Sequence, residues 1–443
     1  MSPHSPLRTA TLLAYGGPIM ALAYLLFFVQ FYFLKFATDV LLLPPAAVGG
    51  LFALAKLWDA VSNPLVGSWS DRTRTRLGRR RPFLLGALPL LGGSFVLLWN
   101  PPTSLTAGPL IVWVGGALFL FFTAFVLYAV PHAALGAELS GDSHQRTRLF
   151  AGKQMSFTLG MLLAFAAIQT AMNAAAPRAT AAALALPAAL LALAALAITP
   201  LVVREPRSPR SGGQSLFGSL RDVFRNPPAR TLLLVWFIES LGVGAVGTMA
   251  PFVAQYLLRR PDVVGSLPAA YVIAGIVSIP LWVRVSRRFG GRDTWLAAML
   301  LAAAAFGGML FIGSGDVSLA LVLLVFAGCA MGCGSVLSSS LMADIIDLDA
   351  GRTGQRKEGV YSAAMLFALK MGSSLATAAS GLVLGAAGFL PNVEQSSESL
   401  IGMRALFGGL PCVGFLVGAA LFWTFPLGRR TPVAIPVARE LAS

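Results

Sequence analysis

Four ionisable side chains stand in stretches that are otherwise apolar, and they are the residues best placed to do chemistry. They are Lys56, Asp59, Glu239 and Lys370. A charge at the centre of a bilayer is costly, so such residues face a protein interior or a watery cavity and carry a function by default. A buried carboxyl group takes up a proton readily. We therefore expect these residues to handle protons or ions inside a membrane.

Three polar residues of one stretch share a helix face. Lys56, Asp59 and Asn63 are spaced i, i+3 and i+7, a spacing that brings side chains to the same side of a helix. We expect this face to line the interior of a helix bundle. The alternative is that Lys56 and Asp59 neutralise each other and serve the structure alone.

Composition indicates the elements that must position these residues. The chain of 443 residues is 56% hydrophobic and 12% charged, whereas soluble proteins carry about 25% charged residues. Apolar runs of about 20 residues, long enough to cross a bilayer, recur from end to end. The sequence predicts an all-α integral membrane protein with twelve transmembrane helices, over residues 11–34, 46–69, 83–99, 107–131, 149–173, 180–203, 230–257, 266–286, 294–313, 317–341, 360–388 and 401–425. The first stretch is too long for a removable signal and lacks a clear cleavage site.

The net charge of +15 follows the predicted loops. Arginines cluster in alternate loops, which are 72–81, 204–230, 284–292, 352–356 and 429–430. This is the positive-inside pattern. It predicts an inner (plasma) membrane protein with both termini in the cytoplasm, and it explains the charge without nucleic acid as a partner.

The longest polar linker predicts two halves. Residues 204–229 are rich in Arg, Ser, Pro and Gly. We expect an N-terminal six-helix bundle over 1–203 and a C-terminal six-helix bundle with a short cytoplasmic tail over 230–443.

The loop after the second predicted helix reads "GSWSDRTRTRLGRRR", and it resembles the signature of the major facilitator superfamily. Its glycines suit close helix approach, its acid can pair with an arginine or a helix N-terminus, and its arginines suit an anionic membrane face. The alternative is a positive-inside anchor without further meaning. The residues that carry the resemblance are Gly67, Asp71, Arg72, Gly78, Arg79 and Arg80.

Longer stretches resemble one family of that superfamily, the glycoside–pentoside–hexuronide:cation symporters typified by the melibiose permease. They are "YGGPIMALAYLLFFVQFYFLKFATDV", "KLWDAVSNPLVG", "MADIIDLDAGRTGQRKEGVYS" and "LGAAGFLPNVEQSSESLIGM". The resemblance implies the major facilitator fold, a substrate site near mid-membrane between the bundles, and transport of a glycoside or other small organic solute by alternating access.

The family's cation site is only partly present. The first of its two helix-two aspartates matches Asp59, but Asn63 stands at the second, and two family basic residues match Lys56 and Lys370. A hard cation wants several oxygen ligands, and one carboxylate flanked by two ammonium groups suits sodium poorly. We expect coupling to H+ in preference to Na+, or an uncoupled facilitator.

The family's sugar-binding aspartates are missing, because their positions align with Ala23 and Ala129. The Phe-rich run "LLFFVQFYFLKF" fits lipid contact or the wall of a site for an apolar substrate. A carrier of lysophospholipids or other amphiphiles is therefore the alternative. For Glu239 we expect a replacement proton site or a contact for a cationic group, unless it lies at a membrane interface. The candidate substrate contacts are Tyr24, Gln30, Tyr128, Lys153, Gln154 and Glu239.

Mixed charges at the end of the tenth predicted helix suggest a gate. Asp344, Asp347 and Arg352 stand where ion pairs could hold the cytoplasmic side closed. The alternative is a solvated loop.

Nothing favours an enzyme, which would need a converging acid/base, metal or nucleophile set. The odd number of cysteines, three, all in apolar runs, argues against a disulfide framework. We expect a monomer with no cofactor beyond a transported H+ or Na+, whose partners are membrane lipids and a small-molecule or amphiphilic substrate.

Overall fold

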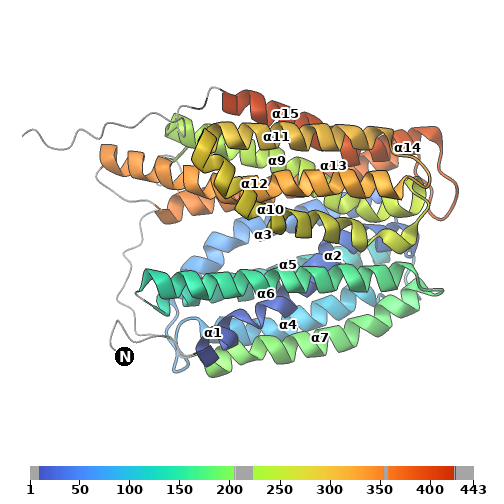
Figure 1. The fold of residues 1–443 in the computed structure, drawn as a ribbon. Coiled ribbons are helices and arrows are strands. Elements are labelled where there is room, and N and C mark those ends of the chain that lie inside the picture. Colours follow the sequence, from blue (N-terminus) through green and yellow to red (C-terminus); the bar gives the residue numbers. More distant parts are fainter. Residues whose placement is uncertain are drawn as a thin grey trace, which may run out of the picture.

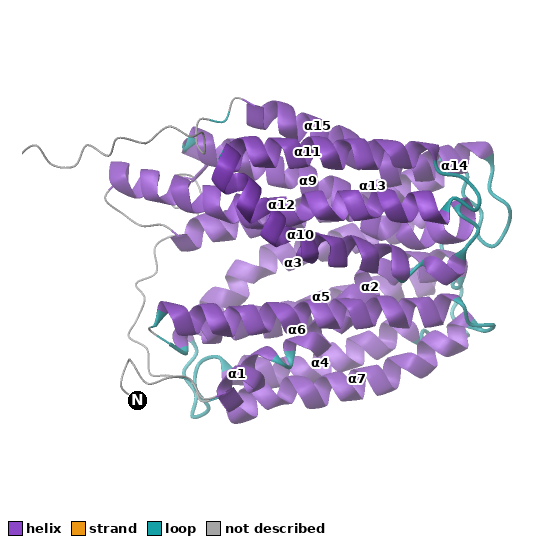
Figure 2. Cartoon of the chain, in the orientation of Figure 1, coloured by secondary structure: helices purple, strands orange, loops and turns teal. Residues whose placement is uncertain are grey.

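A computed structural model describes residues 9–140, 142–203, 205, 223–353, 358–423 and 425, apart from the side chains at 143, 352, 353 and 358. Within these residues every long element is a helix, because a backbone in lipid must satisfy its own hydrogen bonds (Figure 2). The all-α prediction is confirmed. The helices are α1 (Thr9–Gly16), α2 (Ile19–Asp39), α3 (Pro45–Arg72), α4 (Arg81–Trp99), α5 (Ala107–Glu138), α6 (Ser143–Met172), α7 (Pro177–Val202), α9 (Pro227–Phe252), η1 (Val253–Leu257), η2 (Pro261–Val263), α10 (Ser266–Phe289), α11 (Gly291–Gly308), η3 (Met309–Phe311), α12 (Val317–Thr353), α13 (Glu358–Ala386), α14 (Ser397–Arg404), η4 (Ala405–Gly409) and α15 (Leu410–Trp423).

Twelve spans result when the interrupted helices are joined. Eleven described spans are long and apolar enough to cross a membrane, and Thr9–Asp39 and Ser397–Trp423 each count as one of them. The remaining span is α3, which has 28 residues but carries Lys56, Asp59 and a charged last turn. The predicted number of spans is confirmed.

The spans form two bundles, which lie one above the other in Figure 1. In the N-terminal bundle (α1–α7), α4 packs on α5 and α7, and α2 packs on α6. In the C-terminal bundle (α9–α15), α12 packs on α10 and α11, and α9 packs on α13 and α15. The bundles meet mainly through α3 against α13, with α2 against α9 beside them.

The two ends of the molecule are distinct (Figure 1). The terminal end, as we call it, holds the start of α1, the end of α15 and the loop between α3 and α4. The opposite end holds the loops 40–44, 100–106, 173–176 and 387–396.

The phenylalanines of α2 form a bundle core. Trp99 on α4 is fully buried, and its ring centroid lies 4.6 Å from that of Phe28 and 5.0 Å from that of Phe36. Tyr32 and Phe33 also pack on it, at 5.5 and 5.6 Å. These α2 residues fall on one helix face, so the expectation that the run contacts lipid or lines a substrate site is wrong for them.

Several helices extend further than their apolar residues indicate. α12 continues to Thr353, twelve residues past the predicted end at 341, because a helix does not have to stop where the bilayer does. The first span, predicted to be continuous, is interrupted between α1 and α2 at Gly17 and Pro18. Proline lacks the amide hydrogen that a continuous helix needs.

Candidate functional site

Two glycines allow α3 and α13 to touch backbone to backbone near the opposite end. A Cβ atom built on Gly49 would lie 2.8 Å from the Cα atom of Gly381, closer than real Cβ contacts come. A Cβ atom on Gly381 would lie 2.5 Å from the carbonyl oxygen of Pro45. Small residues permit such close packing of membrane helices, so α3 and α13 bring the backbones of the two bundles into direct contact.

A charge cluster of Lys56, Asp59 and Lys370 lies along the same helix pair, nearer the middle. Nζ of Lys370 on α13 is 2.7 Å from Oδ2 of Asp59 on α3. The two side chains are 28% and 9% exposed, respectively. This ion pair links the N-terminal bundle to the C-terminal bundle. Because it is short, it can exist only while α3 and α13 are in contact.

Lys56 binds hydroxyl groups rather than a carboxylate. Its Nζ donates to Oγ of Ser373 and to Oγ1 of Thr377 on α13, both at 3.1 Å, and lies 5.0 Å from the ring centroid of Phe52. The described ion pair of Asp59 is with Lys370. The alternative of a self-contained Lys56–Asp59 pair is therefore wrong for this structure.

Asn63 does not join the carboxylate. Its Nδ2 donates to the backbone oxygen of Asp59 at 2.5 Å, and Oγ of Ser62 donates to the same oxygen at 3.2 Å. Among the described residues, Oδ1 of Asp59 is buried without a hydrogen-bond partner. The expected cation-site role of Asn63 is not seen here, because its amide turns back to its own helix.

A second polar contact between the bundles lies at the opposite end and was missed from the sequence. This opposite-end cluster consists of Lys35, Asp39, Tyr256 and Asn392. Lys35 pairs with Asp39 on α2, and the hydroxyl of Tyr256 on η1 donates to Asp39. Nδ2 of Asn392 donates to the backbone oxygen of Asp39 at 2.8 Å, and its backbone N–H donates to the Tyr256 hydroxyl at 3.0 Å. The available signal was the i, i+4 spacing of Lys35 and Asp39.

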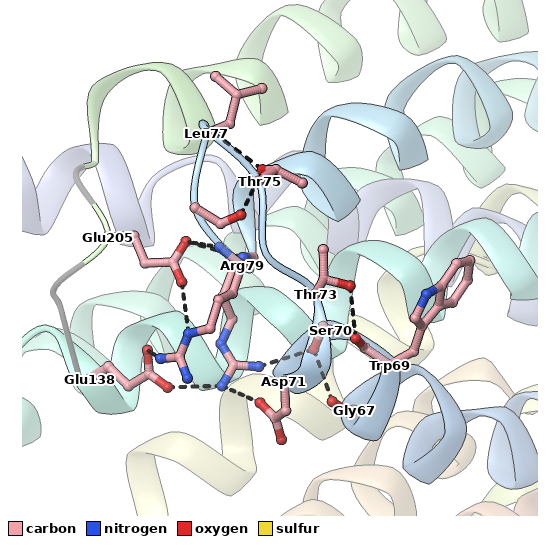
Figure 3. Close-up of polar contacts among 12 residues, drawn as sticks. Gly67, Trp69, Ser70, Asp71, Thr73, Thr75, Leu77, Arg79, Glu138 and Glu205 are labelled. Atoms are coloured by element: carbon pink, nitrogen blue, oxygen red, sulfur yellow. Dashed lines mark hydrogen bonds and ion pairs between the residues drawn. The ribbon is translucent and has the colours of Figure 1, made fainter. Parts of the chain in front are cut away.

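The loop between α3 and α4 is held by a network of ion pairs within the N-terminal half of the chain (Figure 3). Nη2 of Arg80 is 2.6 Å from Asp71 and 2.8 Å from Glu138 on α5. Arg79 reaches Glu138 at 3.1 Å and Glu205 at 3.3 Å. The expected pairing of Asp71 with an arginine is present. Glu138 and Glu205 were missed, since each stands far from the loop in sequence.

Arg80 is 5% exposed, so the expectation that this arginine lies against a membrane surface is wrong, whereas Arg72 is exposed. Gly78 has a φ of +107°, a conformation that favours glycine. Gly67 shows no close approach, because a Cβ atom there would meet only Val130, at 3.7 Å.

The six candidate substrate contacts are not joined to one another by any hydrogen bond or ion pair in the described part of the chain. Tyr128 is fully buried and donates to the backbone oxygen of Leu196 at 2.8 Å, so its expected role in substrate contact is not seen here. Tyr24 and Gln30 on α2 and Lys153 on α6 are half-buried, and Gln154 is exposed.

Glu239 lies on α9 and is 7% exposed. Its Oε1 has no hydrogen-bond partner among the described residues. It therefore lies inside the protein and not at an open interface.

The suggested gate is only partly described. Asp344 and Asp347 lie within α12, on exposed positions of its last turns. The side chain of Arg352 lies outside the described residues, so the gate stays a prediction.

Comparisons with known proteins agree along nearly the whole chain. A family model described as "MFS/sugar transport protein" matches residues 14–429. The glucuronide carrier protein homologue of Escherichia coli (strain K12) is 25% identical over 406 residues, covering 89% of this chain and 88% of that protein. The isoprimeverose transporter of Lactiplantibacillus pentosus is 26% identical over 421 residues, covering 91% and 86%.

A solved structure has the same fold. It is a bacterial homologue of the human lysosomal transporter Spinster, in an inward-facing and unoccupied conformation, with a TM-score of 0.72. The two chains are 15% identical, and the match covers 95% of this chain and 98% of the other.

Proposed function

This chain belongs to the MFS/sugar transport protein family, and we propose that it is a secondary active carrier that couples a sugar-like solute to H+ in preference to Na+. Like its relatives, it is a multi-pass membrane transporter of a sugar-like solute, and it is not an enzyme. The proposal concerns the coupling ion and the way in which the bundles move.

We place the protein in the inner (plasma) membrane, with the terminal end on the cytoplasmic side. Arginines gather at that end, in the loop after α3 and in the last turn of α10, which supports the positive-inside orientation. The proposed domain boundaries are 1–203 and 230–443 around the linker 204–229, although α9 already begins at Pro227. The α3–α13 contact and the opposite-end cluster then close the outer side.

The charge cluster is the observation that carries the proposal. Outward opening requires α3 and α13 to separate, and this removes Lys370 from Asp59. Asp59 then has two ways to avoid an unpaired charge in the membrane. It can pair with Lys56, which lies three residues earlier on the same helix and has also lost its hydroxyl partners, or it can bind a proton. Either step ties the state of the carboxyl group to the position of the bundles.

The ligands around Asp59 support a proton over sodium. A sodium ion needs several oxygen atoms around it, whereas Lys370 occupies Oδ2 of Asp59 and the amide of Asn63 points to the helix backbone. Oδ1 of Asp59 has no hydrogen-bond partner among the described residues, so this oxygen is free to bind one proton. The carbonyl and hydroxyl groups nearby are already engaged.

Transport by the purified protein in vesicles tests the proposal. Radiolabelled glucuronide and isoprimeverose, the solutes named for two relatives, serve as probes, and a lysophospholipid tests the amphiphile alternative. We expect a pH gradient, acidic outside, to drive sugar accumulation, and a sodium gradient to have no effect. Accumulation driven by sodium alone, or transport of the lysophospholipid alone, contradicts the proposal.

The variant Asp59→Asn separates coupling from binding. We expect it to lose accumulation and to keep solute exchange, because the amide neither titrates nor holds Lys370 as an ion pair. Glu398→Gln changes an exposed carboxylate on α14 that lies outside the charge cluster. It is the matched control and should still accumulate solute. Equal accumulation by Asp59→Asn and the unchanged protein would remove Asp59 from the coupling mechanism.

A further inference from the structure

Lys56 lies in an arrangement that resembles a cation site more than an ion pair. The side chain is buried, at 6% exposure, and its ammonium group donates to Ser373 and Thr377, both at 3.1 Å. Oγ1 of Thr248 on α9 is 3.4 Å from Oγ1 of Thr377. Two hydroxyl oxygens of α13 thus bind a monovalent positive charge supplied by the N-terminal bundle, and a third hydroxyl, on α9, lies next to one of them.

The carboxylate of Asp59, one oxygen of which pairs with Lys370, stands on the same helix as Lys56. Oδ1 of Asp59 is buried and has no hydrogen-bond partner among the described residues, and Asp59 is one helical turn from Lys56 on α3. Hydroxyl and carboxylate oxygens are the ligands that hard cations prefer. An ammonium group and an alkali cation carry the same charge and are both bound by such oxygens. The difference is that the ammonium group is covalently attached and cannot leave.

We propose that the ammonium group of Lys56 takes the place of an alkali cation between α3 and α13, and that its removal uncovers a site for Na+ or Li+. The ligands of that site are Ser373, Thr377, Asp59 and, through a small shift, Thr248. Lys56 is then the residue that determines cation specificity, because it makes closure of the bundles independent of sodium. This inference rests on the proposed function, since it explains why H+ is preferred.

Thermal unfolding of purified protein in detergent tests the inference without any transport measurement. The unchanged protein should have the same Tm in choline, potassium, sodium and lithium chloride at equal ionic strength. Lys56→Met should have a lower Tm in choline chloride, and sodium or lithium should raise it in a saturable way. At a cation concentration 100 times the Kd, the rise should be roughly 3 °C.

Two control variants isolate the site. Lys153→Met also removes an ammonium group of the N-terminal bundle, but this group lies over the ring of Phe150 and has no ion pair among the described residues, so sodium should not raise its Tm selectively. The double variant K56M/T377V loses a central oxygen ligand and should lose the sodium response. If Lys56→Met does not fold, Lys56→Gln carries the same comparison, because its amide can still donate to one hydroxyl.

The outcomes are distinct. An equal Tm of the folded Lys56 variants in sodium, lithium and choline overturns the inference, and so does a sodium response of the same size in Lys153→Met. If the unfolding results hold while uptake by the unchanged protein is driven by sodium, the proposed function fails and the uncovered site stands. If uptake is driven by protons and the Lys56 variants ignore sodium, only the uncovered site fails.

Discussion

Alanine at Gly49 should force α3 and α13 apart, whereas alanine at the next position, Gly50, should not. The added Cβ atom at Gly49 would lie 2.8 Å from Gly381, about 0.6 Å short of the 3.4 Å at which ordinary contact begins, and the atoms it meets are backbone atoms that cannot rotate away. A Cβ atom at Gly50 meets nothing within 4 Å. Both changes improve helix propensity by about 1 kcal/mol, so their difference reports the contact alone.

The expected size follows from overpacking. Extra atoms in a well-packed contact cost about 1–3 kcal/mol. Because this contact joins the bundles and lies outside their cores, the cost falls on the state that closes the opposite end. The ratio of closed to open molecules should fall about 5- to 150-fold. A separation of 0.6 Å would also lengthen the 3.1 Å bonds of Lys56 beyond hydrogen-bonding range.

Pulsed electron spin resonance measures this shift as a distance distribution. Spin labels at Ser104 and Ser397, which are exposed and lie at the opposite end of different bundles, should report a longer, newly populated distance in Gly49→Ala. The distribution of Gly50→Ala should match that of the labelled parent. Identical distributions in both variants would refute the argument that α3 and α13 must touch for closure.

Three further predictions concern side chains and a turn described above. Arg80→Ala should lower Tm, because it removes the partner of the half-exposed Asp71 and one of the two partners of Glu138, a loss of about 1.5–3 kcal/mol, whereas Arg72→Ala, an exposed change at the end of α3, should not alter it. Gly78→Ala should cost about 1–3 kcal/mol in thermal unfolding because of the φ of +107°, and an unchanged Tm would argue against strain. Tyr256→Phe removes the Tyr256 hydroxyl from the opposite-end cluster. The ratio of closed to open molecules, measured with the same spin labels, should fall about fivefold, and an unchanged ratio would show that this hydroxyl is not needed for closure.

Sequence patterns predicted the twelve spans and the embedded charges, whereas only the family resemblance placed Lys370 beside Asp59. Apolar runs and loop arginines report on each span separately, so they locate helices well. They place Asp59 on a helix face without saying which helix it meets, and Lys370 lies on the eleventh span. Tyr128 was offered as a substrate contact because its hydroxyl is polar. Only the packing of α5 on the bundle shows that the backbone of Leu196 already accepts that hydrogen.

The ends of helices and the roles of small residues were also beyond reach of the pattern. The apolar run that marks a span ends where the bilayer ends, whereas α12 continues for several turns past the end of its apolar run. Gly67 and Gly49 look alike in the sequence. The first meets a distant Val130 and the second meets the backbone of Gly381, a difference that depends on the distance between two helices.

The polarity of α3 has a consequence for biosynthesis. This span is the one that falls outside the set of described spans apolar enough to cross a membrane. The two hydroxyl partners of Lys56 are synthesised 317 and 321 residues later. At about 5–20 residues per second, the ribosome needs roughly 15–60 s to reach them. During that interval the N-terminal bundle must shelter a lysine and an aspartate by its own means. A chain truncated before α13 should therefore be recognised and degraded by membrane quality control, even though its first ten spans are complete.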